Sequence, residues 1–251
     1  MSILKPFFVF GGVSSKSMGL TIEDKDILSG AEADVTEYEI PGRDGTVFES
    51  NGRYNNIEIA YETYLKVAEQ EDLPRFTGEL KRWLLSGPGE YRRLEDTYDP
   101  DHYRMATAQG GLKIEQAGRR FTRQSILFSC KPFRYRKSGE RKIKVGNGLT
   151  LQNDTGFTAR PKIEINMQGS GLVLIRVEGE SGTPYATSIE TTGAQRLILD
   201  SASEEALQSG NTTTSYIPLD AFPELRPGKN RIIISGAKIT SAQITPCWRE
   251  L

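Results

Sequence analysis

The sequence predicts a mainly β protein of two β-sandwich-like domains, the first of which carries one packed α-helix. Two observations predict this class. Most segments alternate apolar and polar residues over short runs, which is the pattern of half-buried strands. Turns rich in glycine and proline stand between such segments, at residues 41–45 in the first half and at residues 227–230 in the second. Turns of this composition join β-strands.

The first half opens with a predicted pair of strands at residues 34–40 and 57–61. The turn at residues 41–45 and the Asn51–Gly52 pair lie between them. This region is either one long hairpin or two strands with an extended connector.

One segment departs from the β pattern and predicts a helix over residues 72–85. Asp72 is a candidate N-cap, Pro74 is tolerated in the first turn, and the glycines of residues 86–89 end the helix. Its apolar residues share one face and are expected to pack against a sheet: Leu73, Phe76, Leu80, Trp83 and Leu84.

Further strands follow the helix, and the last of them is the longest. In it Ile126, Phe128 and Cys130 share a face, and Pro132 predicts that its end lies at a sheet edge. The strands are expected at residues 91–94, 103–108, 112–116 and 124–133.

The stretch from residue 119 to residue 144 holds ten basic residues and a single acid, Glu140. We interpret it as a solvated or subunit-facing surface. Nucleic-acid contact is the alternative, and it is less favoured because the stretch does not have aromatic residues regularly placed among the basic ones. Acids at residues 32–39 or 58–71 of a neighbouring copy could face it. The candidate protomer or partner contacts are Arg43 and Asp44 at the first turn, and Arg119, Arg120, Arg123, Arg134 and Arg136.

A composition change at residues 146–148 predicts the domain boundary. Residues 1–145 hold 23 basic against 22 acidic residues, whereas residues 146–251 hold 9 against 11 and are richer in serine, threonine and glycine. A mobile loop is expected at residues 209–214. The second domain is predicted to be an antiparallel sandwich. Its strands are expected at residues 161–167, 172–178, 186–191, 196–200, 213–219, 231–235 and 242–248.

The residues that usually carry chemistry are sparse, so we expect neither an enzyme nor a cofactor or metal site. Cys130 and Cys247 lie far apart and are expected to be small buried hydrophobes. The single histidine, His102, stands in a polar stretch and is expected in a solvated loop. The glycine-rich residues 11–16 lack the spacing of a phosphate-binding loop.

Charge and hydropathy point to a protein made in the cytoplasm. The net charge of -1 gives no strong field that would concentrate nucleic acid or anionic membrane. The first apolar run, residues 7–10, is too short for a secretory core or a membrane span.

Nine short segments together resemble the distal tail proteins of long-tailed, non-contractile bacteriophages (siphophages). Each is common alone, but their order and spacing extend over nearly the whole chain. They are residues 8–15, 19–20, 40–45, 52–54 and 128–133 of the first half, and residues 199–201, 222–225, 227–230 and 244–246 of the second.

The resemblance implies a ring-forming β-rich domain at residues 1–145 and a galectin-like or carbohydrate-module-like sandwich at residues 146–251. It also implies a homohexameric ring at the virion's distal tail tip that joins the tail tube to tip or baseplate proteins. The implied partners are the terminal tail tube protein, a tail-associated fibre or lysin protein, and receptor-binding proteins. The alternative is a carbohydrate-binding adhesion module that stacks sugars on exposed Tyr185, Tyr216 or Trp248.

Overall fold

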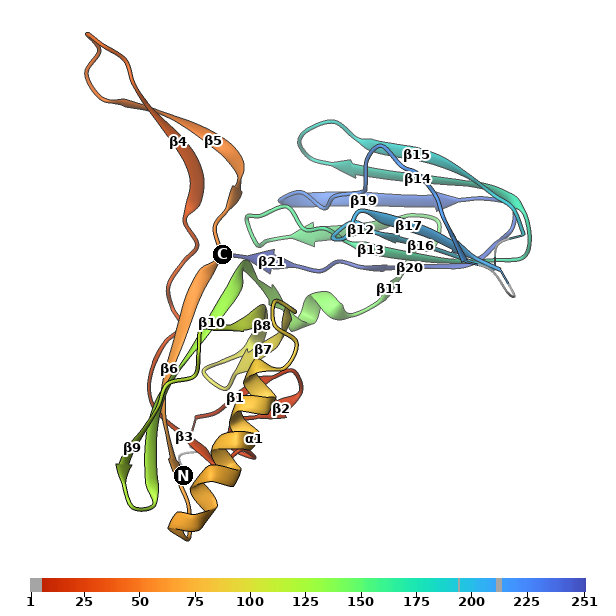
Figure 1. Cartoon of the computed structure of the whole chain (residues 1–251). Helices are drawn as coiled ribbons and strands as arrows, with labels where there is room; N and C mark the ends of the chain where they lie inside the picture. Colours follow the sequence, from red (N-terminus) through yellow and green to blue (C-terminus); the bar gives the residue numbers. More distant parts are fainter. Residues whose placement is uncertain (1–5, 194, 211–213) are drawn as a thin grey trace, which may run out of the picture. The chain divides into compact units, whose positions relative to one another are not determined.

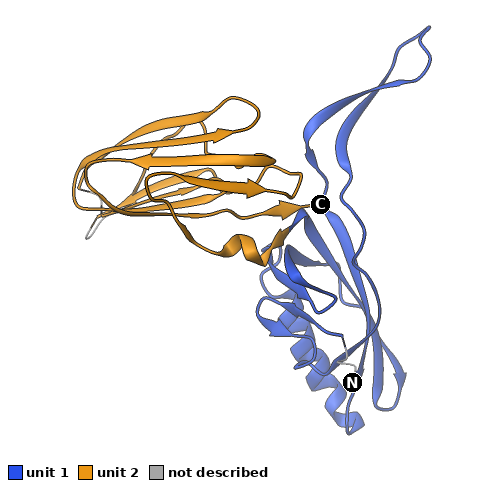
Figure 2. Cartoon of the chain, turned by 180° about the vertical axis from the view of Figure 1, so that it is seen from behind, with its two compact units in different colours: residues 1–134, 251 blue, residues 135–250 orange. Residues whose placement is uncertain are grey.

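A computed structural model describes residues 6–193, 195–210 and 214–251. Half of the loop predicted at residues 209–214, and the first residue of the strand predicted at 213–219, fall outside these residues. The chain divides into two compact units, residues 1–134 with Leu251 and residues 135–250 (Figure 1, Figure 2). As predicted, the fold is mainly β with one α-helix.

The division between the units lies at residues 134 and 135, before the boundary predicted from composition after residue 145. The physical reason is the pairing of strand β11 (Ile143–Lys144) with β20 (Ile239–Thr245), in which Ile143 stands opposite Ile244. Composition does not reveal this pairing. The segment before Gly146 is as highly charged as the first unit, although it belongs to the second unit.

The first unit is built on one antiparallel sheet in the order β2-β1-β7-β8-β10-β6-β3, with β9 paired to β10. The pairing of β1 with β7 sets Phe8 opposite Asp96 and so joins segments that are distant in the sequence. The strands are β1 (Phe8–Phe10), β2 (Val13–Ser14), β3 (Leu20–Asp26), β6 (Ile57–Lys66), β7 (Arg92–Asp96), β8 (Asp99–Gln109), β9 (Ile114–Gly118) and β10 (Phe121–Arg136).

Strand β10 lies inside this sheet, between β8 and β6. Its residues Ile126, Phe128 and Cys130 are buried on one face, as predicted. The expectation that Pro132 lies at a sheet edge concerned only the end of this strand, and there the neighbour β6 is absent, because the pairing of β10 with β6 stops before Pro132. The proline is tolerated because it lies beyond the last residue paired with β6, which is Cys130 opposite Ile57.

The predicted helix is α1 (Leu73–Leu85), and it ends at Ser86 as expected. Asp72 makes no side-chain cap, because a 3₁₀ turn (Gln70–Asp72) precedes the helix and holds Asp72 itself in helical conformation. The buried helix residues Leu73, Leu80, Trp83 and Leu84 form the predicted face, and Phe76 is partly buried against the same core.

Aromatic rings fill the core between the helix and the sheet. The Phe8 and Tyr61 ring centroids lie 4.5 Å apart, and Phe128 lies 4.8 Å from Phe10 and 5.6 Å from Phe8. Trp83 stacks on Phe8 and donates its indole N–H to the Phe10 carbonyl oxygen at 3.0 Å. Helix and sheet are therefore fixed to one another by packing and by a buried hydrogen bond.

Arg92 on β7 closes the C-terminal end of α1. Its guanidinium donates to the carbonyl oxygens of Trp83 and Leu84 at 3.2 and 3.0 Å, and it lies 4.1 Å from the centre of the Phe10 ring. The last carbonyls of a helix lack partners within the helix. A strand residue supplies them here.

The second unit is a sandwich of two antiparallel sheets whose inner faces share one core. The first sheet has the order β11-β20-β13-β16-β17-β18, and the second has β12-β19-β14-β15. The remaining strands of these sheets are β12 (Leu149–Asn153), β13 (Lys162–Met167), β14 (Gly171–Gly179), β15 (Tyr185–Thr191), β16 (Arg196–Asp200), β17 (Glu205–Ser209), β18 (Thr214–Tyr216) and β19 (Gly228–Ser235). The short strand β21 (Arg249–Glu250) belongs to neither sheet.

Residues 227–230 were predicted to be a turn between strands, and they form the entry to β19, which begins at Gly228. Asn230 is fully buried. Its side chain accepts a hydrogen bond from the Arg226 amide at 2.9 Å and donates to the Arg226 and Gly228 carbonyl oxygens at 2.7 and 3.1 Å. The Asn230 side chain therefore makes the hydrogen bonds that backbone groups usually make within a turn.

Replacing Asn230 with alanine is expected to destabilise the second unit by about 2–3 kcal/mol, because the change leaves buried backbone groups of Arg226 unsatisfied. Urea unfolding followed by Trp248 fluorescence measures the loss. The exposed Asn147 is the matched control, and its alanine variant should change stability by less than about 0.5 kcal/mol. Equal stability of the two variants would contradict the role given to Asn230.

Candidate assembly surfaces

Strands β4 (Ala33–Glu39) and β5 (Thr46–Tyr54) form a hairpin with a two-stranded sheet of its own (Figure 1). The strand predicted at residues 34–40 is β4, but its partner is β5, which the sequence did not predict. The strand predicted at residues 57–61 is part of β6, which pairs with β3 and β10 and not with β4. Asn51 and Gly52 do not form a turn but lie within β5, where the Asn51 amide donates to Asp34 at 3.0 Å. Hydrogen bonds from Asn51 and Arg53 lower the pKa of the Asp34 carboxyl.

The hairpin exposes large apolar side chains on both faces. Phe48 is 63% exposed and Tyr38 is 48% exposed. In the cross-strand register Glu37 stands opposite Phe48, and Tyr38 stands opposite Val47, so neither face is purely polar. A two-stranded hairpin without a core is marginally stable in water, and open strand edges tend to pair with other chains. The hairpin is therefore the strongest candidate for a protein contact.

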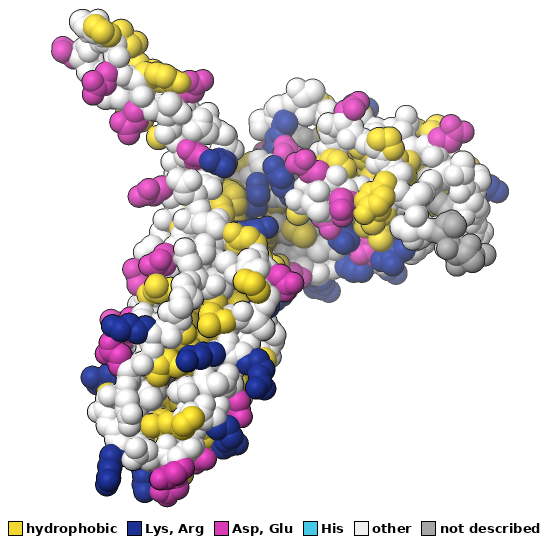
Figure 3. Space-filling model, viewed as in Figure 1, with side chains coloured by type: hydrophobic (Ala, Val, Ile, Leu, Met, Phe, Trp, Pro, Cys, Tyr) yellow, Lys and Arg dark blue, Asp and Glu magenta, His cyan; other side chains and the backbone are white. Residues whose placement is uncertain are grey.

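Arg43 and Asp44 lie at the hairpin tip and are exposed, as predicted. The tip is closed by a hydrogen bond from the Arg43 amide to the Ile40 carbonyl oxygen at 3.1 Å, and Gly42 and Gly45 adopt φ values of 80° and 81°. Between residues 33 and 54 the hairpin carries five acids against two arginines. Figure 3 shows acidic and apolar side chains together on it.

The five predicted arginines do not form one patch. Arg119, Arg120 and Arg123 lie at the β9–β10 turn and the start of β10. The side chains of Arg120 and Arg123 remain more than half exposed while they pair with Glu69 at 2.8 Å and with Glu23 at 3.3 Å. We call residues 119–123 the basic turn.

Arg134 and Arg136 belong to different units and are mostly buried. Arg134 pairs with Asp99 at 3.0 Å, and Arg136 pairs with Glu250 at 2.9 Å and with Asp154 at 2.7 Å. The structure therefore brings three of the five arginines together and uses the other two in ion pairs within their own units.

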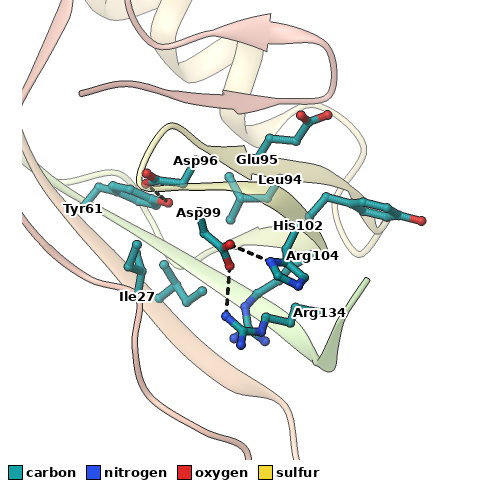
Figure 4. A pocket seen from close by; sticks show the side chains of 11 residues that line it. Ile27, Tyr61, Leu94, Glu95, Asp96, Asp99, His102, Arg104 and Arg134 are labelled. Carbon is teal, nitrogen blue, oxygen red and sulfur yellow. Dashed lines mark hydrogen bonds and ion pairs between the residues drawn. The ribbon is translucent and has the colours of Figure 1, made fainter. Parts of the chain in front are cut away.

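His102 was expected in a solvated loop, but it lies on β8 with only 16% of its side chain exposed. Its Nδ1 lies 2.6 Å from Asp99 Oδ1, and the other carboxylate oxygen of Asp99 accepts from Arg134 (Figure 4). The polar run around His102 misled the prediction, because β8 continues through it and turns these side chains toward a partly buried cluster.

Asp96 is the second acid of this cluster. It accepts a hydrogen bond from the Tyr61 hydroxyl at 2.8 Å and pairs with Lys25 at 3.0 Å. Burial raises the pKa of Tyr61. The hollow that these side chains line measures about 30 Å³, room for about one water molecule. The cluster therefore has the dimensions of an internal polar network and not of a substrate pocket.

Both cysteines are free, and burial raises the pKa of Cys130 to about 12 and that of Cys247 to about 11. Within the described residues no group of three His, Cys, Asp or Glu side chains could hold a metal ion. No helix in this part of the chain is long and apolar enough to cross a membrane.

The three aromatic residues suggested for sugar stacking are not equally exposed. Tyr216 is 73% exposed, whereas Tyr185 and Trp248 are partly buried and pack against the core of the second unit. Of the three rings named for the alternative function, only Tyr216 is therefore exposed.

No family model matches the sequence, and no curated protein matches it. Solved structures with a similar fold, by contrast, are found. The crystal structure of the SPP1 Dit protein, described as a paradigm of the hub adsorption apparatus in phages that infect Gram-positive bacteria, is similar with a TM-score of 0.72 at 13% identity, over 98% of each chain.

Two structures of the phage p2 baseplate in its activated conformation are similar as well. The one with strontium gives a TM-score of 0.57 at 10% identity over 95% of this chain and 96% of that chain. The one with calcium gives 0.58 at 12% identity over 96% and 97%. The chain therefore has, over almost its whole length, the fold of the phage hub protein Dit.

Proposed function

We propose that this protein is a structural, non-enzymatic hub at the distal end of a long non-contractile phage tail. Six copies would form a ring that joins the tail tube to tip or baseplate proteins. The observation that carries the proposal is the fold shared with SPP1 Dit over 98% of the chain, which includes both units. Its partners would be the terminal tail tube protein, a fibre or lysin protein, and receptor-binding proteins.

The first unit offers two different surfaces that suit a closed ring. A cyclic ring larger than a dimer uses a heterologous interface, in which one patch on each copy meets a different patch on the next. The hairpin is acidic and carries exposed apolar side chains, and the basic turn carries Arg119, Arg120 and Arg123. Opposite charge across such an interface speeds association and fixes the register.

Light scattering and negative-stain microscopy of the purified protein test this proposal. We expect a ring of six copies, formed by the protein alone or on the end of a tail tube. A protein that stays monomeric at high concentration, and that also fails to bind tail tubes, would overturn it.

Reversing the charge of the basic turn is expected to slow ring assembly at low salt and to reverse its salt dependence, because salt screens attraction in the parent protein and repulsion in the variant. The variant replaces Arg119, Arg120 and Arg123 with glutamate, which converts attraction toward the hairpin acids into repulsion. Stopped-flow light scattering at low and high ionic strength measures the rate. Reversal of three cationic residues of the second unit, Arg176, Arg231 and Lys238, is the matched control.

A second set of substitutions distinguishes pairing from unspecific charge effects. Replacing Glu37 and Glu39 with arginine in the reversed variant should restore assembly if the hairpin meets the basic turn. Unchanged assembly in the first variant, or no restoration in the second, would contradict this pairing while leaving the ring itself testable by microscopy.

A further inference from the structure

We propose that the second unit carries a docking pocket for an arginine side chain of a partner protein. The pocket is a hollow of about 230 Å³ between the β16–β17 turn, residues 201–204, and the segment of residues 219–224. We call it the acidic hollow. It goes beyond the ring contacts proposed for the first unit and does not depend on them.

Acidic side chains dominate this hollow. Glu204, Asp220 and Glu224 line it against a single cation, Arg160, which pairs with Glu204 at 3.3 Å. Asp220 and Glu224 make no ion pair within the described part of the chain, and Glu224 interacts with Arg249 only through the field of its charge. The hollow therefore attracts a cation from outside and repels anions.

The distribution of these acids favours an organic cation over a metal ion. Three acids line the hollow, yet no group of three His, Cys, Asp or Glu side chains among the described residues could hold a metal ion. The carboxylates therefore do not converge on one point. A guanidinium carries five N–H donors in one plane and reaches acceptors that lie apart, whereas an ammonium is a compact point charge.

A buried hydroxyl is an independent sign that a donor from outside belongs in the hollow. Ser201 lines the hollow and is 2% exposed, and its hydroxyl has no hydrogen-bond partner among the described residues. Buried polar groups without a partner are unfavourable and rare in folded proteins. The hydroxyl oxygen can accept a hydrogen bond from a guanidinium N–H.

The apolar part of the wall also suits arginine. Phe222 and Pro223 line the hollow, and Phe222 is partly buried against the core of the unit. A guanidinium is weakly hydrated and stacks on aromatic rings, and the methylene groups of an arginine side chain pack on apolar surface. A pocket that combines carboxylates with an aromatic side chain therefore favours arginine over lysine.

Hydrogen bonds order both segments around the hollow. On one side, the Asp200 carboxylate accepts from the amides of Ala202 and Ser203 at 3.1 and 3.4 Å and so fixes the β16–β17 turn. On the other side, Leu225 exchanges two backbone hydrogen bonds with Ala159, at 2.9 and 3.0 Å. A pocket that is ordered before its partner arrives loses less entropy on binding.

Methyl NMR titration of the full chain with the blocked peptide Gly-Gly-Arg-Gly-Gly tests the proposal. The reporters are the methyl groups of Leu219 and Ala221, which line the hollow. We expect their signals to shift with a dissociation constant of about 1–10 mM, a range suited to one side chain in a small pocket. The peptide with lysine should bind about threefold more weakly. The peptide with citrulline, which has the shape of arginine without its charge, should not bind.

Substitutions assign binding to the hollow. Asp220→Asn combined with Glu224→Gln is expected to weaken binding by more than about tenfold, because both partners of the guanidinium lose their charge. Ser201→Ala is expected to weaken it about threefold without lowering the melting temperature, since the hydroxyl has no hydrogen bond to lose. The matched control is Glu180→Gln combined with Glu190→Gln, which removes two exposed charges of the same unit outside the hollow. It should leave binding unchanged.

Three results of these titrations would overturn the proposal. The first is that the arginine peptide shifts neither reporter at about 50 mM. The second is that the citrulline peptide binds equally well. The third is that the variant with Asp220→Asn and Glu224→Gln binds as the parent protein does.

Two further probes separate the arginine of a protein from other ligands. Shifts of the reporters with calcium chloride, and none with the arginine peptide, would make the hollow a metal site and overturn the proposal. Free arginine carries a carboxylate that the acids repel, so it should bind more weakly than the peptide; equal binding would contradict docking of a protein. Ring formation is followed by light scattering in the same samples, so failure of the hollow and failure of the hub are told apart.

Discussion

Replacing Phe128 with alanine is expected to destabilise the first unit by about 3–5 kcal/mol, the usual loss for a fully buried phenylalanine. Phe128 is 0% exposed and lies on the interior strand β10. Its ring is in contact range of Phe8, Phe10 and Tyr61. Because domains are stable by only about 5–15 kcal/mol, this single cavity removes a large part of the margin.

The two tryptophans allow the effect to be located. Trp83 lies in the first unit and Trp248 in the second. In variants that keep one tryptophan, the replacement being phenylalanine, urea unfolding reports each unit separately. Phe128→Ala should shift the Trp83 transition to lower urea. Phe48→Ala, at a side chain 63% exposed, is the matched control with an effect below about 0.5 kcal/mol. A shift no larger than that of the control would refute the account of this core.

Removing the exposed rings of the hairpin is expected to abolish the ring without unfolding the protomer. The variant replaces Tyr38 and Phe48 with serine. Aromatic residues dominate interface energies, with losses of about 2 kcal/mol or more each on truncation. Two such losses weaken association about a thousandfold for each interface. Both side chains are about half exposed or more in the protomer, so its own stability should change little.

Size-exclusion chromatography with light scattering over a range of concentrations measures this loss. The control replaces Leu172 and Leu174, which are 51% and 47% exposed on the second unit, with serine. We expect the control to form rings as the parent protein does. Rings of equal stability in both variants would show that the hairpin makes no essential contact.

Local sequence patterns predicted those elements whose own residues determine their secondary structure. The helix at Leu73–Leu85 follows from the spacing of its apolar residues, and the buried face of β10 follows from alternation. By contrast, β17 has the sequence EALQS and buries a single residue, so its strand character depends on its neighbours β16 and β18. Such a strand forms because it pairs with its neighbours in the sheet, and its own residues do not predict it.

The candidate surfaces show the same limit. The sequence predicted only the first strand of the hairpin, at residues 34–40, and missed β5, in which Phe48 is 63% exposed. His102 was misplaced because the partly buried cluster around it is completed by Arg134, which pairs with the same Asp99 as His102 and is distant in sequence. Asn230 seemed part of a turn since asparagine is typical of turns, whereas its side chain serves a buried strand entry.

The pairing of β1 with β7 also fixes the order of events during synthesis. Phe8 cannot find its partner strand until the ribosome has made Asp96, and Arg92, which closes the end of α1, is made just before it. Long-range pairing of this kind slows folding. The first strand to be made must therefore wait for a late one. A nascent chain remains unable to present its finished surfaces to other copies until most of the first unit has been translated.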